Sequence, residues 1–146
     1  MANAVRSAEV VWDGNLLQGS GRFTVGSGAL PADLPVTWPA RTEEPGGKTS
    51  PEELIAAAHA SCYAMAFSHT LDQAGHPPEE LRVRATVSFD PNGPNVTRSR
   101  LEVTGRVPGL DAGEFQRLAE QGEQGCPVSN ALRGNVDMEL SASLAQ

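Results

Sequence analysis

The sequence predicts an α+β fold, in which strands flank one long helix and two shorter helices precede a last strand. Two observations support this prediction. An alanine-rich run from residue 54 to residue 74, with apolar positions at helical spacing, indicates a long helix. Several segments on both sides of it alternate apolar and polar residues with a period of two, as half-buried strands do. Strands and helices in this segregated order are typical of α+β domains.

The first part of the chain predicts a hairpin followed by a weak third strand. Residues 4–12 alternate as a strand does, Asp13-Gly14 is a turn signal, and residues 21–25 supply the returning strand. Residues 34–38 are apolar, but prolines stand before, within and after the segment. Because proline cannot donate a hydrogen bond to a sheet, we expect an edge strand there at best. The Gly- and Pro-rich residues 41–49 predict a loop.

The clearest element is a helix from Pro51 to Ala74. Ser50 suits the N-cap, Pro51 suits the first helical position, and Glu53 occupies the capping-box position. Gly75 ends the helix before two prolines. Small residues on most sides predict a largely buried central helix. We expect its inward face to be formed by the apolar residues at positions 54, 55, 58, 62, 65 and 66.

The second half of the chain predicts a strand pair, two shorter helices and a final strand. Residues 81–90 and 96–107 alternate on either side of a Pro-Asn-Gly-Pro turn. A capping pattern of Asp111 with Glu114 opens a helix, and Gly-Cys-Pro at 125–127 opens a shorter one that ends at Gly134. Residues 136–144 alternate again as a last strand. The length of 146 residues fits a single domain, residues 1–146.

The composition excludes several classes of function. The formal net charge is −7, from 18 acidic and 11 basic residues, and no stripe of Lys or Arg would attract nucleic acid. The longest weakly polar stretch, residues 54–67, is too short to span a bilayer. Phosphate-binding glycine loops and serine-hydrolase motifs are absent from the sequence.

The first residues contain no apolar stretch of signal-peptide length. We therefore expect a cytoplasmic protein in a reducing compartment. In such a compartment a disulfide is usually transient, and it serves catalysis or redox sensing. The two cysteines of the chain, Cys62 and Cys126, are accordingly the residues to consider first.

Cys62 lies in the middle of the predicted long helix, where the helix dipole has little effect on it. Apolar surroundings would raise the pKa of its thiol and make it inert, so reactivity needs a cation brought from elsewhere in the fold. Arg41, in the loop before the helix, and Arg22 could each supply one. On these residues alone, a packed core cysteine beside a surface arginine is the favoured interpretation.

Cys126 has a different predicted setting. Pro127 at the first helical position places Cys126 at the N-cap, where unpaired backbone N–H groups stabilise a thiolate. The alternative is a cysteine standing where Ser or Asn often stands, and the residues alone leave both open. Glu52, near the start of the long helix, is by itself an ordinary acid that complements the helix dipole.

His59 shares a helix face with Cys62, since the two are three residues apart. A zinc pair or a histidine base for the thiol are the two functional interpretations. With two cysteines and three histidines in the chain and no Cys-x-x-Cys spacing, a zinc ligand set would be incomplete. A histidine that is hydrogen-bonded in the core or exposed at the surface is therefore favoured.

Two motifs taken together resemble the OsmC/Ohr family of thiol-dependent hydroperoxide reductases. Residues 50–66, SPEELIAAAHASCYAMA, are similar to the long-helix signature of the osmotically inducible (OsmC) proteins. Residues 125–132, GCPVSNAL, resemble the second-cysteine motif of the same family. The order of strands and helices is similar from about Val5 to Leu144.

The resemblance implies antiparallel sheets packed around a long central helix, in an intertwined homodimer. It implies a peroxidase that reduces organic hydroperoxides, and less efficiently hydrogen peroxide, to alcohols and water in oxidative or osmotic stress. In such proteins the first cysteine attacks the peroxide, the second resolves the sulfenic acid to a disulfide, and an arginine and a glutamate assist. By position these residues are Cys62, Cys126, Arg41 and Glu52.

The resemblance implies no metal and no organic cofactor. It implies an external dithiol, carried by a lipoyl protein or a thioredoxin-like protein, as the reductant. The loop between Arg41 and Glu52 carries a small insertion relative to the family pattern. In the organic hydroperoxide resistance (Ohr) branch the arginine comes from an early glycine-rich segment, which Gly-Ser-Gly-Arg at 19–22 resembles loosely. Arg22 is thus the alternative to Arg41, while the stretch around His59 is of the OsmC type.

Two functions of other classes stay open from the sequence. One is a non-enzymatic redox-sensing or stress-storage dimer, which would consume reducing equivalents once instead of catalytically. The other is a binder of small apolar ligands with inert thiols, which slow alkylation of Cys62 near neutral pH would reveal.

Overall fold

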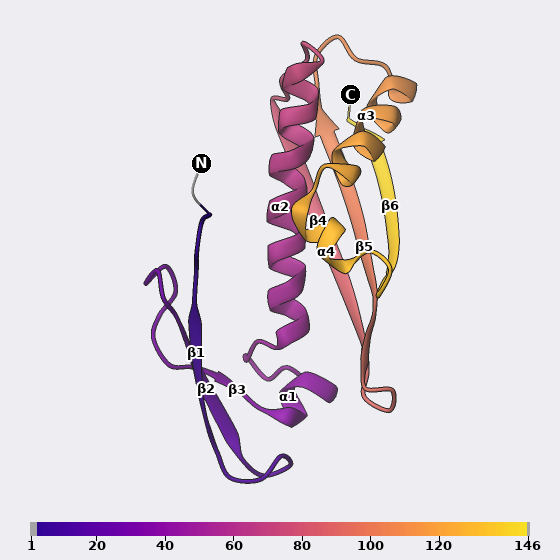
Figure 1. The fold of residues 1–146 in the computed structure, drawn as a ribbon. Helices are drawn as coiled ribbons and strands as arrows, with labels where there is room; N and C mark the ends of the chain where they lie inside the picture. The colour runs from indigo at the N-terminus through magenta and orange to yellow at the C-terminus, as the bar shows by residue number, and fades with distance from the viewer. Residues whose placement is uncertain (1–2, 146) are drawn as a thin grey trace. The chain divides into compact units, whose positions relative to one another are not determined.

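A computed structural model describes residues 3–145 of the chain (Figure 1). The residues fall into two compact units, divided between Pro51 and Glu52. Strands and helices occur in both, which confirms the predicted α+β class. Among the residues described, none of the helices combines the length and apolar character that a bilayer-spanning segment requires.

The first unit contains a three-stranded antiparallel sheet. Its strands are β1 (Ala8–Asp13), β2 (Ser20–Val25) and β3 (Leu34–Val36), in the order β1-β2-β3. The predicted hairpin is confirmed, with Asp13 opposite Ser20 at the closed end. β3 is an edge strand as expected, and its Pro35 lies opposite Arg22.

A short helix, α1 (Trp38–Thr42), follows β3 in a region where the sequence predicted a strand end and a loop. Thr37 caps it, since its side-chain oxygen accepts a hydrogen bond from the backbone N–H of Ala40 at 3.2 Å. Pro39 stands in its first turn, where proline favours a helix. That proline was interpreted as a strand breaker, so the helix was missed.

The second unit has a three-stranded sheet with helices on one face. The long helix α2 (Pro51–Gln73) begins at the division and leads into β4 (Glu80–Asp90) and β5 (Asn95–Arg106). α3 (Ala112–Gln124), α4 (Pro127–Leu132) and β6 (Asp137–Leu144) complete the chain, and the sheet order is β4-β5-β6. Figure 1 shows α2, α3 and α4 on the same side of these strands.

Most of these elements were predicted within a residue or two. Gly75 has a φ of +84°, the left-handed conformation expected after the helix end, and Asp111 caps α3 by accepting from the N–H of Glu114 at 2.8 Å. The resemblance implied antiparallel sheets, and this is wrong for one pair of strands, since β6 pairs with β5 in parallel. The parallel pairing follows from the crossover through α3 and α4, because such a connection returns the chain to the same end of the sheet.

The core lies between the sheet and the helices of the second unit. Tyr63, Phe67 and Leu71 recur every four residues on α2 and are fully buried. They pack in one cluster with residues of β5 and α3, including Leu101, Val103, Phe115 and Leu118. The rings of Phe67 and Phe115 lie 5.2 Å apart, which fixes α2 against α3.

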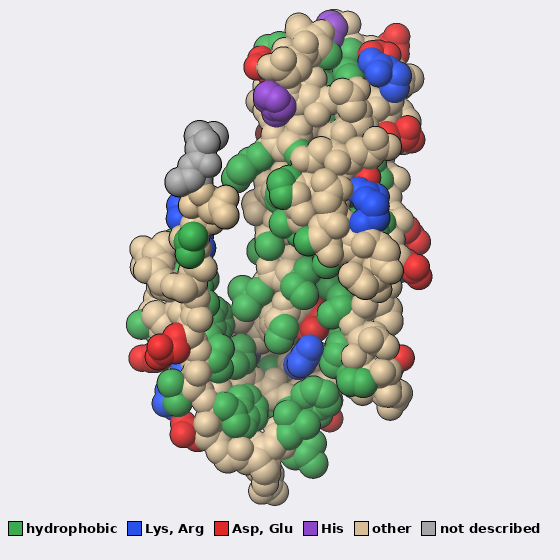
Figure 2. All heavy atoms as spheres, viewed as in Figure 1, with side chains coloured by type: hydrophobic (Ala, Val, Ile, Leu, Met, Phe, Trp, Pro, Cys, Tyr) green, Lys and Arg blue, Asp and Glu red, His purple; other side chains and the backbone are tan. Residues whose placement is uncertain are grey.

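The inward face predicted for α2 is wrong for this core. None of the six positions named for it is fully buried, and Met65 exposes 72% of its surface. Small residues surround the helix, so hydrophobicity alone gives little contrast between its sides, and the large aromatic side chains decide which side is buried. On the opposite side of α2 the apolar residues Leu54 and Met65 are exposed, while His69 and Asp72 follow toward the end of the helix, and Figure 2 shows hydrophobic side chains along part of it.

Candidate functional site

The first candidate residue, Cys62, lies on α2 at the margin of the core. Its neighbour Tyr63 is fully buried, and the Tyr63 hydroxyl donates a hydrogen bond to the carbonyl oxygen of Ala119 at 2.9 Å. This contact ties α2 to α3 immediately beside the thiol. Cys62 is half-buried and packs against the core cluster, so its sulfur is neither sealed in the interior nor fully in solvent.

The second candidate, Cys126, is the N-cap of α4, as predicted. It is fully buried, and its sulfur accepts a hydrogen bond from the backbone N–H of Ser129 at 3.5 Å. Pro127 occupies the first helical position, where the absence of its N–H costs nothing. The sulfur therefore points back over the first turn of the helix, toward its unpaired donors.

The two thiols lie together, and both are free in this structure. The Cys126 side chain and the backbone of Val128 both influence the pKa of the Cys62 thiol, so the first turn of α4 lies near this sulfur. Burial raises the pKa of the Cys62 thiol and the neighbouring Cys126 adds to the rise, while the Val128 N–H opposes it. The net pKa is above the ordinary value, as predicted for a thiol in apolar surroundings.

His59 is a hydrogen-bonded core histidine, which confirms the favoured interpretation. It is fully buried, its Nδ1 lies 2.6 Å from Ser99 Oγ on β5, and its Nε2 lies 2.7 Å from Ser129 Oγ on α4. Burial lowers the pKa of His59, although the carboxylate of Glu123 opposes this effect. Within residues 3–145 no group of three or more His, Cys, Asp or Glu side chains could hold a metal ion.

Sequence reasoning missed both serine partners of His59. A signal existed for Ser99, because it falls on the inward side of β5 in phase with Leu101 and Val103, where a polar residue needs a partner. No local signal existed for Ser129, because His59 is 70 residues away in the sequence. The spacing of His59 from Cys62 pointed to the thiol, yet the ring nitrogens are engaged by serine hydroxyls.

Arg41 and Glu52 belong to different units. Arg41 lies on α1, with its guanidinium 5.8 Å from the centre of the Trp38 ring, in a cation–π contact. Glu52 is buried in the first turn of α2. The approach of Arg41 to Cys62 and to Glu52 stays a prediction. The alternative, Arg22, donates to Asp13 at 2.9 Å across the β1–β2 hairpin, and both side chains are largely exposed.

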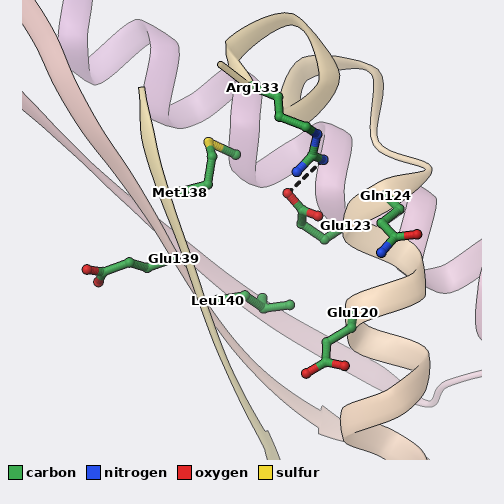
Figure 3. Close-up of a pocket in the computed structure, with 7 residues that line it drawn as sticks. All are labelled: Glu120, Glu123, Gln124, Arg133, Met138, Glu139 and Leu140. Atoms are coloured by element: carbon green, nitrogen blue, oxygen red, sulfur yellow. Dashed lines mark hydrogen bonds and ion pairs between the residues drawn. The ribbon is translucent and has the colours of Figure 1, made fainter. Parts of the chain in front are cut away.

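Several pockets lie outside the thiol pair. In the first unit a pocket of about 110 Å³ is lined mainly by apolar residues, with one guanidinium. Its lining residues are Trp12, Leu16, Val36, Thr37, Trp38, Arg41 and Pro51. In the second unit a pocket of about 290 Å³ lies between the end of α3, the residue after α4, and β6 (Figure 3). There Arg133 donates to Glu123 at 2.9 Å and connects the end of α4 to α3.

Comparison with known proteins gives one consistent result. A family model described as OsmC-like protein matches residues 44–141. The chain is 35% identical over 136 residues to Peroxiredoxin OsmC of Escherichia coli K12. The alignment covers 92% of this chain and 94% of that protein. It is also 35% identical over 104 residues to the organic hydroperoxide resistance protein of Xanthomonas axonopodis pv. citri, covering 66% and 68% of the two chains.

Solved structures agree with these relatives. The organic hydroperoxide resistance protein of Elizabethkingia anophelis aligns with a TM-score of 0.72 at 26% identity, over 99% of this chain and all of that one. An organic hydroperoxide resistance protein OsmC from Legionella pneumophila aligns with a TM-score of 0.70 at 28% identity, over 97% of this chain and 99% of that one.

The buried setting of His59 predicts a pH-dependent stability. Because burial holds the pKa of His59 below its ordinary value of about 6.5, the unfolded chain binds a proton there at a higher pH than the folded chain does. The contribution of neutral His59 to stability is therefore complete above the ordinary pKa. It decreases as the pH falls from there toward the lower pKa of the folded state. Between about pH 7.5 and about pH 5.5 we expect the free energy of unfolding to fall more in the wild type than in His59→Gln. Urea titrations at one protein concentration measure both differences, and equal decreases would contradict the prediction.

Proposed function

Because this chain belongs to the OsmC-like protein family, we propose that it is a peroxidase that reduces organic hydroperoxides with Cys62 as the attacking thiolate. The names of its relatives support a peroxidase-type role. The observation that carries the proposal is the proximity of the two thiols: Cys62 packs against the core cluster that contains Cys126, and Cys126 affects the pKa of the Cys62 thiol. A half-buried thiol beside a second thiol is the arrangement by which a sulfenic acid can be converted to an intramolecular disulfide.

The proposed reaction has two steps on the protein. The Cys62 thiolate attacks the distal oxygen of the hydroperoxide, the O–O bond breaks, and the alkoxide leaves as an alcohol after taking up a proton. This step leaves a sulfenic acid on Cys62. The Cys126 sulfur then attacks the Cys62 sulfur, a disulfide forms, and water leaves. An external dithiol, from a lipoyl protein or a thioredoxin-like protein, restores the two thiols by exchange.

The raised pKa of Cys62 means that the second unit alone keeps this residue as a thiol. A cation is needed to form the thiolate, and we assign this role to Arg41, which stays charged in any environment. Glu52 would hold the guanidinium through a charge-assisted hydrogen bond. The buried carboxyl of Glu52 on the first turn of α2 is suited to such a partner. The apolar surroundings of Cys62 favour organic hydroperoxides over hydrogen peroxide.

We further propose that the chain functions as a two-fold homodimer in which the uncovered side of α2 is buried. The helix has 23 residues and is roughly 34 Å long at the usual rise per residue. Tyr63, Phe67 and Leu71 cover only one side of it, while Leu54 and Met65 on the other side are exposed. An apolar side of this length is normally covered by a partner, and an identical copy is the commonest one.

The first prediction of this proposal concerns the two cysteines. Cys62→Ser should abolish consumption of an alkyl hydroperoxide, because serine supplies no nucleophile of comparable strength, while the far-UV spectrum stays unchanged. Cys126→Ser should still react once per chain but lose turnover with a dithiol. A steady-state assay with cumene hydroperoxide and dihydrolipoamide measures both. Substantial turnover by Cys62→Ser would refute the assignment, and a single stoichiometric reaction of the wild type would favour a redox sensor instead.

The second prediction compares the two arginines. Arg41→Ala should raise the apparent pKa of the Cys62 thiol further and slow the hydroperoxide step by on the order of 100-fold, as loss of one activating charge commonly does. Arg22→Ala is the control, because Arg22 already has Asp13 as a partner on the exposed hairpin. Iodoacetamide alkylation rates as a function of pH measure the thiol. The reverse ordering would identify Arg22 as the active-site arginine.

The third prediction concerns assembly. Ala57→Glu or Ala64→Glu on the uncovered side of α2 should abolish the dimer and the activity together, because a carboxylate there would be buried without a partner. Thr86→Glu is the control, since it adds the same charge on the exposed side of β4. Sedimentation at micromolar concentration gives the oligomeric state. A well-folded, active wild-type monomer would contradict the proposal.

A further inference from the structure

A buried chain of three polar side chains crosses the second unit near the thiols. His59 is hydrogen-bonded through Nδ1 to Ser99 Oγ at 2.6 Å and through Nε2 to Ser129 Oγ at 2.7 Å, and all three residues are fully inaccessible. We call this set the Ser-His-Ser bridge. Within an otherwise apolar core, polar groups are costly unless every partner is in place, so this bridge fixes the relative position of the elements that carry it.

The bridge joins α2, β5 and α4, and it attaches α4 to the core together with its N-cap Cys126 and with Val128, which pack in or against the core cluster. α4 has only six residues, and Ser129 is its one buried residue. The other side-chain hydrogen bonds of this segment are near the surface: Arg133 donates to Glu123 (Figure 3), and Asn130 donates to the carbonyl oxygen of Gln124. A helix this short has little stability of its own, so its position depends on these attachments.

The same turn of α4 presents the second thiol. The backbone N–H of Ser129 donates to Cys126 Sγ at 3.5 Å, while the Ser129 hydroxyl is held by His59. Val128, the preceding residue, packs with Cys62 against the core cluster that contains Cys126. One residue, Ser129, therefore connects the Ser-His-Ser bridge to the position of the Cys126 sulfur.

We propose that His59 and Ser129 are positioning residues for disulfide formation, holding Cys126 against the sulfur of Cys62. The inference rests on the proposed function. The Cys62 sulfenic acid has two possible fates. Either the Cys126 sulfur displaces its oxygen, forming the S–S bond and releasing water, or a second hydroperoxide oxidises it to sulfinic acid and leaves as an alcohol. Because the first reaction is intramolecular, its rate depends on how well Cys126 is held in place.

The geometry argues against a role for His59 as the base that deprotonates Cys62. A neutral imidazole has one donor and one acceptor nitrogen, and in this protein each nitrogen is paired with a serine hydroxyl. No lone pair is left for the thiol. His59 can act on the reaction only through Ser129 and α4, so its effect should appear in the second step and not in the first.

The bridge provides its own matched control. Ser129→Ala and Ser99→Ala each remove one buried hydroxyl from His59, but only Ser129 belongs to α4. After repeated turnover with cumene hydroperoxide and dihydrolipoamide, mass spectrometry gives the ratio of sulfinic acid to disulfide at Cys62. We expect Ser129→Ala to raise this ratio about tenfold, the effect of one lost buried hydrogen bond, and Ser99→Ala to raise it less than about twofold.

A second pair of variants, both at His59, tests the positioning role if Ser129→Ala does not fold. The amide of Gln reaches the place of Nε2 and can keep the bond to Ser129, whereas the shorter Asn reaches the place of Nδ1 and can keep only Ser99. We expect His59→Asn to raise the ratio of sulfinic acid to disulfide as Ser129→Ala does, and His59→Gln to stay near the wild type.

The first chemical step separates this inference from the proposed function. In a Cys126→Ser background, Ser129→Ala should leave the rate of sulfenic acid formation at Cys62, measured by dimedone trapping, within about twofold of its parent. Equal ratios in Ser129→Ala and Ser99→Ala would overturn the positioning role alone, as would a slowed first step without a changed ratio. If wild-type Cys62 forms neither sulfenic acid nor disulfide with hydroperoxide, the proposed function fails and the positioning role fails with it.

Discussion

The packing of one side of α2 against β5 and α3 is the constraint from which the rest of the second unit follows. Tyr63, Phe67 and Leu71 lie one above another on that side and are fully buried, which sets the rotation of the helix about its axis. His59 continues the same row toward the N-terminus and is therefore drawn into the core. Cys62 is one residue out of phase with the row, so its sulfur lies at the margin, where a substrate can reach it and a second element can cover it.

Features that depend on local chemistry could be predicted from the sequence. Asp111 accepts from the N–H three residues later, Cys126 caps a helix that begins with proline, and Gly75 takes up the left-handed conformation at a helix end. Each of these involves neighbours within a few residues, so residue types and spacing contain the needed information. The hydrogen-bonded state of His59 was also favoured from the residues, whereas the pairing of Cys62 with Cys126 was implied only by the family resemblance.

Features that depend on remote partners could not be predicted in this way. β6 pairs in parallel with β5 because of a crossover that no single segment reveals. The buried side of α2 is decided by the aromatic and aliphatic side chains of the other elements that pack against it. The small residues of the helix itself left that choice open. The partners of His59 are 40 and 70 residues away in the sequence. Pro39 was interpreted as breaking a strand, but it stands in the first turn of α1, where proline favours a helix.

The placement of Cys126 on the crossover between β5 and β6 has a thermodynamic consequence. A bond from there to Cys62 on α2 would enclose β4, β5 and α3 in one covalent loop. Closing a loop of this order restricts the unfolded chain and favours the folded state by roughly 4 kcal/mol. By linkage the fold favours the oxidised pair by the same amount, and each 1.4 kcal/mol corresponds to about 30 mV of reduction potential. Because the fold stabilises the disulfide, a reductant needs a lower reduction potential than an unconstrained disulfide would require. A dithiol that forms a cyclic disulfide on oxidation meets this need better than a monothiol does.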